Sequence, residues 1–217
     1  MNSFTRWGGV ASLIQAVTFM IGFWFYFTLL GPANYGSMSV DPAQNVAFLV
    51  DNKTLMYVWN LTIYVVFGIF LLVQALALHE RLGAKAPALM KTATAFGLMW
   101  ATVIIACGMV ANIGTGVVTR LHATDPEAAG AAWVTLSFVV DGLGGGNEII
   151  GGLWVTLLSI AGLRSRELSA PLHYLGIIVG LSGLLTTIPP LKDLGAIFGI
   201  GLIAWYIWMG IAPLRNR

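Results

Sequence analysis

The stretch from Asp141 to Trp154 holds the densest group of chemically active residues in the chain. It reads DGLGGGNEIIGGLW and contains two carboxylic acids, one carboxamide and six glycines. Both acids lie in or beside apolar sequence, where a charge is costly and by default faces protein or water and has a function. The pattern favours a polar pocket for a small molecule, a proton or a cation, with Asp141, Asn147 and Glu148 as candidate ligand-binding residues.

Two local conformations are compatible with this stretch. In a continuous helix, at about 100° per residue, the two carboxyls lie about 10 Å apart on one face, with glycines between them and Ser159 further along. The run Gly144–Gly146 argues against that helix, because each glycine costs about 1 kcal/mol relative to alanine. In the alternative, a short outer helix ends near Val140 and a new one starts near Asn147. The helix dipole then stabilises the carboxylate of Glu148.

Two further roles for Glu148 require no ligand. It lies about 5 Å below the outer edge of its predicted crossing, at 1.5 Å per residue, so its side chain can reach interfacial water. It can also form a structural bond to Asn60, Gln15 or Arg120. The sequence leaves these roles open beside ligand binding.

Other polar residues lie inside predicted crossings and can face the same interior. Asn60 shares a helix face with Tyr64 and Gln74, and Gln15 lies on the first crossing. The ordinary interpretation of such residues is hydrogen bonding between helices. Trp154 lies deep in its crossing, where an indole N–H needs a partner. The candidate ligand-binding set is therefore Asp141, Asn147, Glu148, Trp154, Asn60 and Gln15.

The sequence predicts no catalytic residues, no metal site and no identifiable cofactor. Its single cysteine, Cys107, lies in an apolar run, and its three histidines lack the spacing of haem or zinc ligands. Two carboxylates about 10 Å apart can flank a water molecule, which leaves a lipid-modifying intramembrane enzyme as the weakest alternative.

The composition defines the elements that must position these residues. Of 217 residues, 58% are hydrophobic and 9% are charged, and the mean hydropathy is +0.84. Soluble domains are about one-quarter charged, so the composition excludes an ordinary soluble enzyme, a disordered chain and a nucleic-acid-binding protein. A helical crossing needs about 20 apolar residues. We therefore expect an all-α integral membrane protein with a single transmembrane domain over residues 1–217.

Hydropathy predicts six transmembrane helices arranged as three hairpins. The expected crossings are residues 8–30, 54–78, 92–113, 145–163, 172–189 and 194–213. The long connections 31–53 and 114–144 contain apolar stretches too short to cross, Val46 to Val50 and Ala131 to Val140. We expect each stretch to form a short helix at the outer interface.

Lysine and arginine residues predict the orientation, because cytoplasmic loops carry an excess of them. With the N-terminus inside, the inner segments hold eight of the eleven basic residues: Arg6, Arg81, Lys85, Lys91, Arg164, Arg166, Arg215 and Arg217. The outer segments hold Lys53, Arg120 and Lys192. Both termini are therefore expected to be cytoplasmic.

Small residues and tryptophans predict how the helices pack. Gly176 and Gly180, and likewise Gly195 and Gly199, are four residues apart and allow close helix approach. They serve either packing within the chain or a homo-oligomer or larger membrane complex. Four tryptophans near predicted boundaries are expected to anchor at the interface: Trp7, Trp59, Trp133 and Trp208.

Four stretches of the second half resemble a known family. They are residues 144–154 (GGGNEIIGGLW), 163–166 (LRSR), 173–183 (HYLGIIVGLSG) and 205–210 (WYIWMG). They are similar to the bacterial membrane-protein family called domain of unknown function 4386. The resemblance implies a multi-helix protein of the bacterial inner membrane, and it implies no activity, cofactor or catalytic residue.

Two non-catalytic functions fit these observations better than an enzyme. The first is binding or moving a small molecule or ion through a polar pocket in the outer half of the bundle, in contact with the lipid bilayer. The second is an accessory or structural subunit of a larger membrane complex, motivated by the glycine-faced final hairpin.

Overall fold

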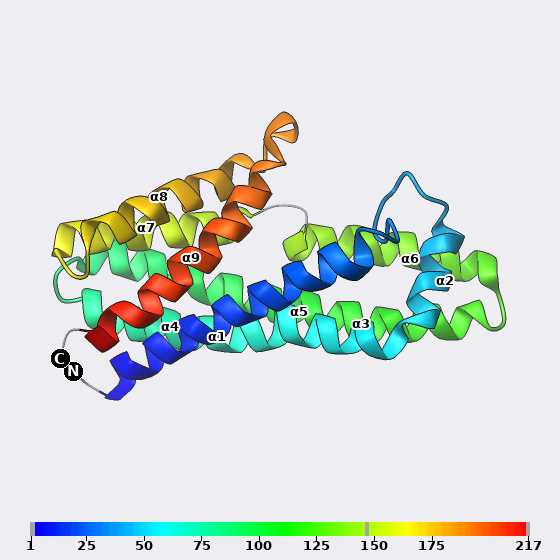
Figure 1. The fold of residues 1–217 in the computed structure, drawn as a ribbon, viewed down its shortest axis with the longest axis horizontal. Coiled ribbons are helices and arrows are strands. Elements are labelled where there is room, and N and C mark those ends of the chain that lie inside the picture. Colours follow the sequence, from blue (N-terminus) through cyan, green and yellow to red (C-terminus); the bar gives the residue numbers. More distant parts are fainter. Residues whose placement is uncertain (1–2, 146–147, 216–217) are drawn as a thin grey trace. The chain divides into compact units, whose positions relative to one another are not determined.

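The described chain is entirely helical. The structure is a computed structural model, and it describes residues 3–145 and 148–215 (Figure 1). These residues contain no strand, which confirms the all-α prediction. The helices are α1 (Ser3–Phe25), α2 (Pro42–Asp51), α3 (Lys53–Asn60), α4 (Phe67–Leu82), α5 (Pro87–His122), α6 (Pro126–Val140), α7 (Ile149–Ser165), α8 (Ala170–Leu185) and α9 (Leu194–Arg215). π-Helical segments Tyr26–Leu30, Leu61–Val66 and Asp141–Gly145 follow α1, α3 and α6, and a 3₁₀ turn, Pro189–Leu191, precedes α9.

The two short helices expected within the long connections are present as α2 and α6. Both begin with the same capping motif, an aspartate N-cap followed by a proline at the first helical position. The carboxylate of Asp41 accepts a hydrogen bond from the Ala43 amide (2.8 Å), and that of Asp125 accepts one from the Ala128 amide (3.0 Å). A capping carboxylate satisfies an amide that has no partner within the helix.

Each expected crossing lies on a helix, but several bounds differ from the prediction. The crossing expected at 92–113 belongs to α5, a helix of 36 residues. Hydropathy marks only the apolar middle of this helix. The helix continues almost to Pro126 because no proline interrupts it after Pro87. At 1.5 Å per residue α5 is about 54 Å long, well beyond the about 30 Å of a hydrocarbon core.

The crossing expected at 172–189 is shorter than predicted. It corresponds to α8, which has 16 residues, because the chain leaves the helix before Pro189 and Pro190. Its length of about 24 Å is below the thickness of a hydrocarbon core. Among the described residues, five helical segments are long and apolar enough to cross a membrane, and α8 is a shorter apolar helix.

The polar stretch between α6 and α7 is not one regular helix. The π-helical segment Asp141–Gly145 contains Gly144 with non-helical torsion angles, and α7 begins only at Ile149. The crossing expected at 145–163 therefore starts four residues late, and the conformation with an interruption is the one observed. Asn147 lies outside the described residues.

The helices group into two compact units. The first comprises residues 3–19, 67–102 and 148–215, and thus α4, α7, α8, α9 and parts of α1 and α5. The second comprises residues 20–66 and 103–145.

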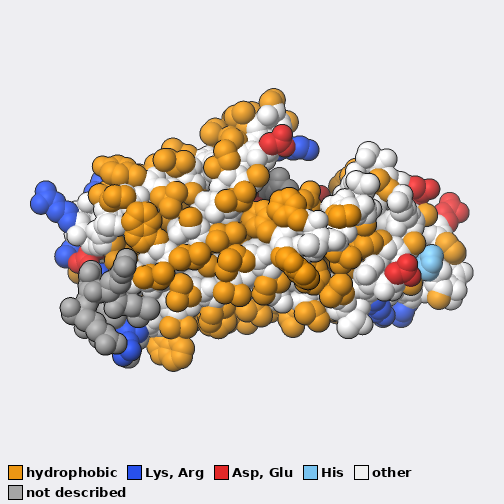
Figure 2. All heavy atoms as spheres, viewed as in Figure 1, with side chains coloured by type: hydrophobic (Ala, Val, Ile, Leu, Met, Phe, Trp, Pro, Cys, Tyr) orange, Lys and Arg blue, Asp and Glu red, His pale blue; other side chains and the backbone are white. Residues whose placement is uncertain are grey.

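Sequential neighbours in the first unit run antiparallel. Gly152 of α7 lies against Gly180 of α8, whereas Gly162, further along α7, lies against His173, near the start of α8. The start of α1 lies beside the end of α9, since Gly9 approaches the carbonyl of Gly210. In Figure 2, lysine and arginine side chains gather at the end of this unit where α7 turns into α8.

Close contact between α7 and α8 depends on glycine. A Cβ atom on Gly180 would lie 2.7 Å from the carbonyl oxygen of Gly152 and 2.8 Å from the amide nitrogen of Thr156. Gly176 is likewise buried against Ser159 of α7. Two of the four glycines singled out in the sequence therefore pack within the chain, as the first of the two interpretations expects.

The second unit has its own apolar core. It consists mainly of α2, α6 and the last turns of α5, and includes Leu49, Val118 and Trp133. Trp133 is 2% exposed and contacts Tyr35 edge to face, at a ring-centroid distance of 6.2 Å. The prediction that Trp133 is an interfacial anchor is wrong, because the short helix α6 folds its apolar face onto α2.

The outer surfaces of the helices are strongly apolar. Large hydrophobic side chains are exposed on several helices, and Figure 2 shows them spread over the flanks. Ile113 of α5 and Ile178 of α8 are 73% and 62% exposed. Surfaces of this kind fit contact with lipid, as expected for a multi-pass membrane protein.

Candidate functional site

Glu148 is the acidic residue at the start of α7, within the candidate span Pro126–Ser165. Its backbone conformation (φ −118°, ψ 33°) is non-helical, and its carbonyl accepts the hydrogen bond from the Gly152 amide that opens the helix (2.8 Å). Its amide donates to the hydroxyl of Thr186 (3.0 Å), which donates in turn to the carbonyl of Gly183 (2.7 Å). The end of α8 thus holds the backbone of Glu148 in place.

The carboxyl group of Glu148 takes no part in these backbone hydrogen bonds. It forms no capping hydrogen bond and no ion pair with the described residues. The side chain is half-buried. A half-buried carboxylate without a cationic or hydrogen-bonding partner is energetically costly, so a positively charged or proton-donating partner would be favourable here.

Tyr206, on α9, is a second buried polar residue of the first unit. Tyr206 is 0% exposed, and its hydroxyl has no hydrogen-bond partner among the described residues. A fully buried phenol normally has a partner, so the Tyr206 hydroxyl is an unsatisfied polar group among the described residues.

Four helices of the first unit contribute aromatic rings to a cluster that includes Tyr206. The Trp100 ring lies 5.3 Å from Phe67, 5.8 Å from Trp154 and 6.2 Å from Phe198, measured between centroids. The Tyr206 ring lies 6.2 Å from Phe67. Phe198 and the backbone of Glu148 both lie against Gly183, and Trp100 lies against Gly151 in the first turn of α7. The backbone of Glu148 therefore lies beside a closely packed aromatic cluster.

The structure distributes five of the six candidate residues over both units, and the sixth, Asn147, lies outside the described residues. Glu148, Trp154 and Gln15 belong to the first unit, whereas Asp141 and Asn60 belong to the second. Trp154 is 1% exposed and is a member of the aromatic cluster. Asp141 is exposed.

Gln15 and Asn60 form bonds between helices. The Gln15 side-chain amide donates to Gln74 on α4 (2.7 Å), and Asn60 donates to Asn112 on α5 (3.2 Å). The Gln74 amide donates to Ser12 (2.8 Å), whose hydroxyl donates to the carbonyl of Tyr206 (3.0 Å). This buried network joins α1, α4 and α9, as interhelical hydrogen bonding predicts.

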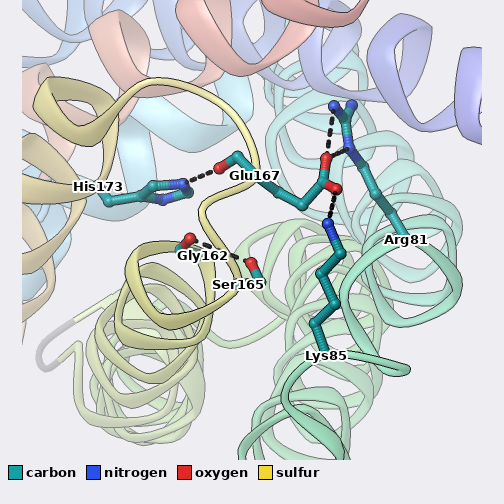
Figure 3. A network of polar contacts seen from close by, with 6 residues as sticks. All are labelled: Arg81, Lys85, Gly162, Ser165, Glu167 and His173. Carbon is teal, nitrogen blue, oxygen red and sulfur yellow. Dashed lines mark hydrogen bonds and ion pairs between the residues drawn. The ribbon is translucent and has the colours of Figure 1, made fainter.

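Sequence reasoning missed a polar cluster at the opposite end of the first unit (Figure 3). Glu167 follows α7, and its carboxylate pairs with Lys85 (2.6 Å) and Arg81 (3.4 Å) from the α4–α5 turn. The Lys85 hydrogen bond is the largest influence on Glu167 and, with the charges of Lys85 and Arg81, holds the pKa of that carboxyl below its usual value. The two turns are far apart in sequence. The only sign of their pairing is that both carry basic and acidic residues.

The same turn is fixed from the other side by His173. Its Nε2 bonds to the backbone carbonyl of Glu167 (2.7 Å), and because a carbonyl only accepts, Nε2 carries the proton. Arg166 and Leu168 on either side of Glu167 have positive φ angles (54° and 64°). The cluster therefore joins the turn after α7 to the turn between α4 and α5.

The described residues contain no group of three histidine, cysteine, aspartate or glutamate side chains that could hold a metal ion. Comparisons with family models, curated proteins and solved structures find no match to this chain. The arrangement around Glu148 is therefore the basis of the functional argument.

Proposed function

We propose that this chain is a six-span protein of the bacterial inner membrane, with both termini cytoplasmic, that binds or moves a small molecule or ion at Glu148. The topology is supported by the antiparallel helices of the first unit, with the start of α1 beside the end of α9. The orientation is supported by the basic residues Arg81, Lys85 and Arg164, near turns at that same end. Protease removal of a C-terminal tag from inside-out but not right-side-out vesicles tests it.

One observation carries the functional proposal. Glu148 lies in a candidate span with a half-buried carboxyl that has no ion-pair partner among the described residues. Ionisable groups inside a membrane commonly mark ligand, ion or proton sites. The α7 dipole stabilises negative charge at this position, and a cationic or hydrogen-bonding ligand would offset the cost of burying that charge.

Native mass spectrometry of protein extracted gently from its own membranes tests the proposal. We expect a small-molecule adduct on the wild-type chain that is lost in Glu148→Gln, which keeps the side-chain shape and removes the charge. Glu127→Gln, at an exposed acid in the first turn of α6, is the matched control and retains the adduct.

Two results would contradict the proposal. One is a wild-type chain without an adduct, and the other is the same adduct on Glu148→Gln. A larger mass that contains other chains would instead support the alternative function, an accessory subunit of a membrane complex.

A further inference from the structure

Basic side chains from two turns gather at one end of the first unit (Figure 2). Arg81 and Lys85 lie at the turn between α4 and α5, and Arg164 and Arg166 lie at the turn between α7 and α8. Glu167 joins the two turns, because its carboxylate pairs with Lys85 (2.6 Å) and Arg81 (3.4 Å) (Figure 3). The joined turns therefore carry four basic residues around a single bridging acid.

The two arginines of the α7–α8 turn are not used by this bridge. Arg164 and Arg166 are exposed, and neither forms an ion pair with the described residues. The backbone beside them is fixed, since the His173 ring bonds to the carbonyl of Glu167 (2.7 Å). An ordered turn thus presents two guanidinium groups that are available to an anion.

Exposed aromatic residues place this end of the unit at the level of lipid headgroups. Tyr174, one turn into α8, is 58% exposed, and Trp7, near the start of α1, is 60% exposed. Trp7 precedes Gly8, which lies against Ala77, one turn before Arg81 on α4. Tryptophan and tyrosine are enriched where the hydrocarbon core meets the headgroups. The basic side chains of the two turns therefore lie where the lipid phosphates lie.

We propose that the joined turns bind the headgroup of an anionic phospholipid, mainly through Arg164 and Arg166. A guanidinium group binds phosphate oxygens in a bidentate manner, and clusters of four or more basic residues beside a membrane helix are typical of anionic-lipid recognition. A zwitterionic headgroup fits less well, because the same side chains repel its ammonium group. The site is separate from Glu148 and requires neither the function proposed for that residue nor the proposed orientation.

Native mass spectrometry with single lipids tests this site. The full chain in detergent is titrated with dioleoylphosphatidylglycerol or with dioleoylphosphatidylethanolamine, which share acyl chains and a phosphate but differ in net charge. We expect the first phosphatidylglycerol to bind the wild-type chain about tenfold more tightly than the first phosphatidylethanolamine. This preference should diminish as the ionic strength rises, because the arginines are exposed.

Charge variants at the exposed arginines separate lipid binding from folding. The double variant Arg164→Gln and Arg166→Gln should bind phosphatidylglycerol about tenfold more weakly than wild type does, with the affinity for phosphatidylethanolamine unchanged. The double variant Arg164→Lys and Arg166→Lys retains both charges and should keep the preference. The matched control is Arg120→Gln and Lys192→Gln, which removes two exposed positive charges elsewhere in the chain and should bind both lipids as wild type does.

Three results would overturn the inference. They are equal affinity of the wild-type chain for the two lipids, unchanged phosphatidylglycerol affinity in the double glutamine variant, and loss of the preference in the double lysine variant. Displacement of phosphatidylglycerol by excess inorganic phosphate would also overturn it, because the site would then bind a soluble anion.

The outcome is distinguishable from that of the function proposed for Glu148. Glu148→Gln should bind phosphatidylglycerol as wild type does, and the double glutamine variant should keep the small-molecule adduct. Loss of the adduct and loss of the lipid preference are therefore separate results, recognised by different masses.

Discussion

The contact between α7 and α8 gives a prediction whose magnitude follows from the structure. In Gly180→Ala, the new methyl group would lie 2.7 Å from the Gly152 carbonyl oxygen and 2.8 Å from the Thr156 amide nitrogen. Both are backbone atoms, so no side-chain rotation relieves the overlap. Overpacking of this kind costs about 1–3 kcal/mol, and it exceeds the gain of up to about 1 kcal/mol from replacing glycine in a helix.

Gly195→Ala is the matched control. There the methyl group would meet only the Thr186 side chain, at 3.7 Å, which is ordinary contact. Thermal unfolding in detergent, followed by tryptophan fluorescence, should give a lower Tm for Gly180→Ala than for Gly195→Ala, by about 2–12 °C for a chain of this size. Equal melting temperatures would show that the two helices do not approach at these glycines.

Two further predictions concern the polar contacts of the first unit. Gln74→Leu removes the acceptor of Gln15 and the donor to Ser12, both buried. We expect a loss of about 1 kcal/mol in unfolding free energy, because two interhelical hydrogen bonds are lost and each contributes about 0.6 kcal/mol in membranes. The second prediction concerns pH. The pKa of Glu167 is lowered in the folded protein by Lys85 and Arg81, so its stabilising contribution is present above the unfolded pKa of about 4.3 and is lost as the pH falls through the folded pKa. Unfolding temperatures measured downward from pH 6 should therefore fall less steeply in Glu167→Gln than in wild type.

Exposed polar residues provide the controls for these two predictions. Gln44→Leu, at an exposed position of α2, should leave the unfolding free energy nearly unchanged. Stability of Gln74→Leu equal to that of wild type would show that the buried network is not formed. Glu127→Gln should retain the wild-type pH dependence of the unfolding temperature. If Glu167→Gln also shows the wild-type pH dependence, the ion pairs of Glu167 with Lys85 and Arg81 are not formed.

Much of the fold could be predicted from hydropathy and turn residues. The helices correspond to the apolar runs, because burial of apolar side chains and satisfaction of backbone hydrogen bonds both favour helices in lipid. Proline and glycine marked most of the turns. Hydropathy could not predict the length of α5, because its last turns pack in the apolar core of the second unit through residues such as Val118.

The candidate site was predictable only in part. Glu148 stands out in sequence because a charge in an apolar segment is unusual, and its position at a helix start follows from the glycines before it. The partners of Gln15 and Asn60 could not be predicted, since a side-chain amide accepts many alternatives and tertiary packing selects one. Tyr206 gave no signal in sequence, because an aromatic residue in an apolar helix is ordinarily part of the core.

The most direct test of the central claim is chemical modification of Glu148 in native membranes. A hydrophobic carbodiimide, N,N′-dicyclohexylcarbodiimide, reacts with carboxyl groups in apolar surroundings, and peptide mass spectrometry locates the product. The account predicts modification of Glu148 and none of the exposed Glu127. An unreactive Glu148, or equal modification of Glu127, would contradict an unpaired carboxyl in apolar surroundings at the start of α7.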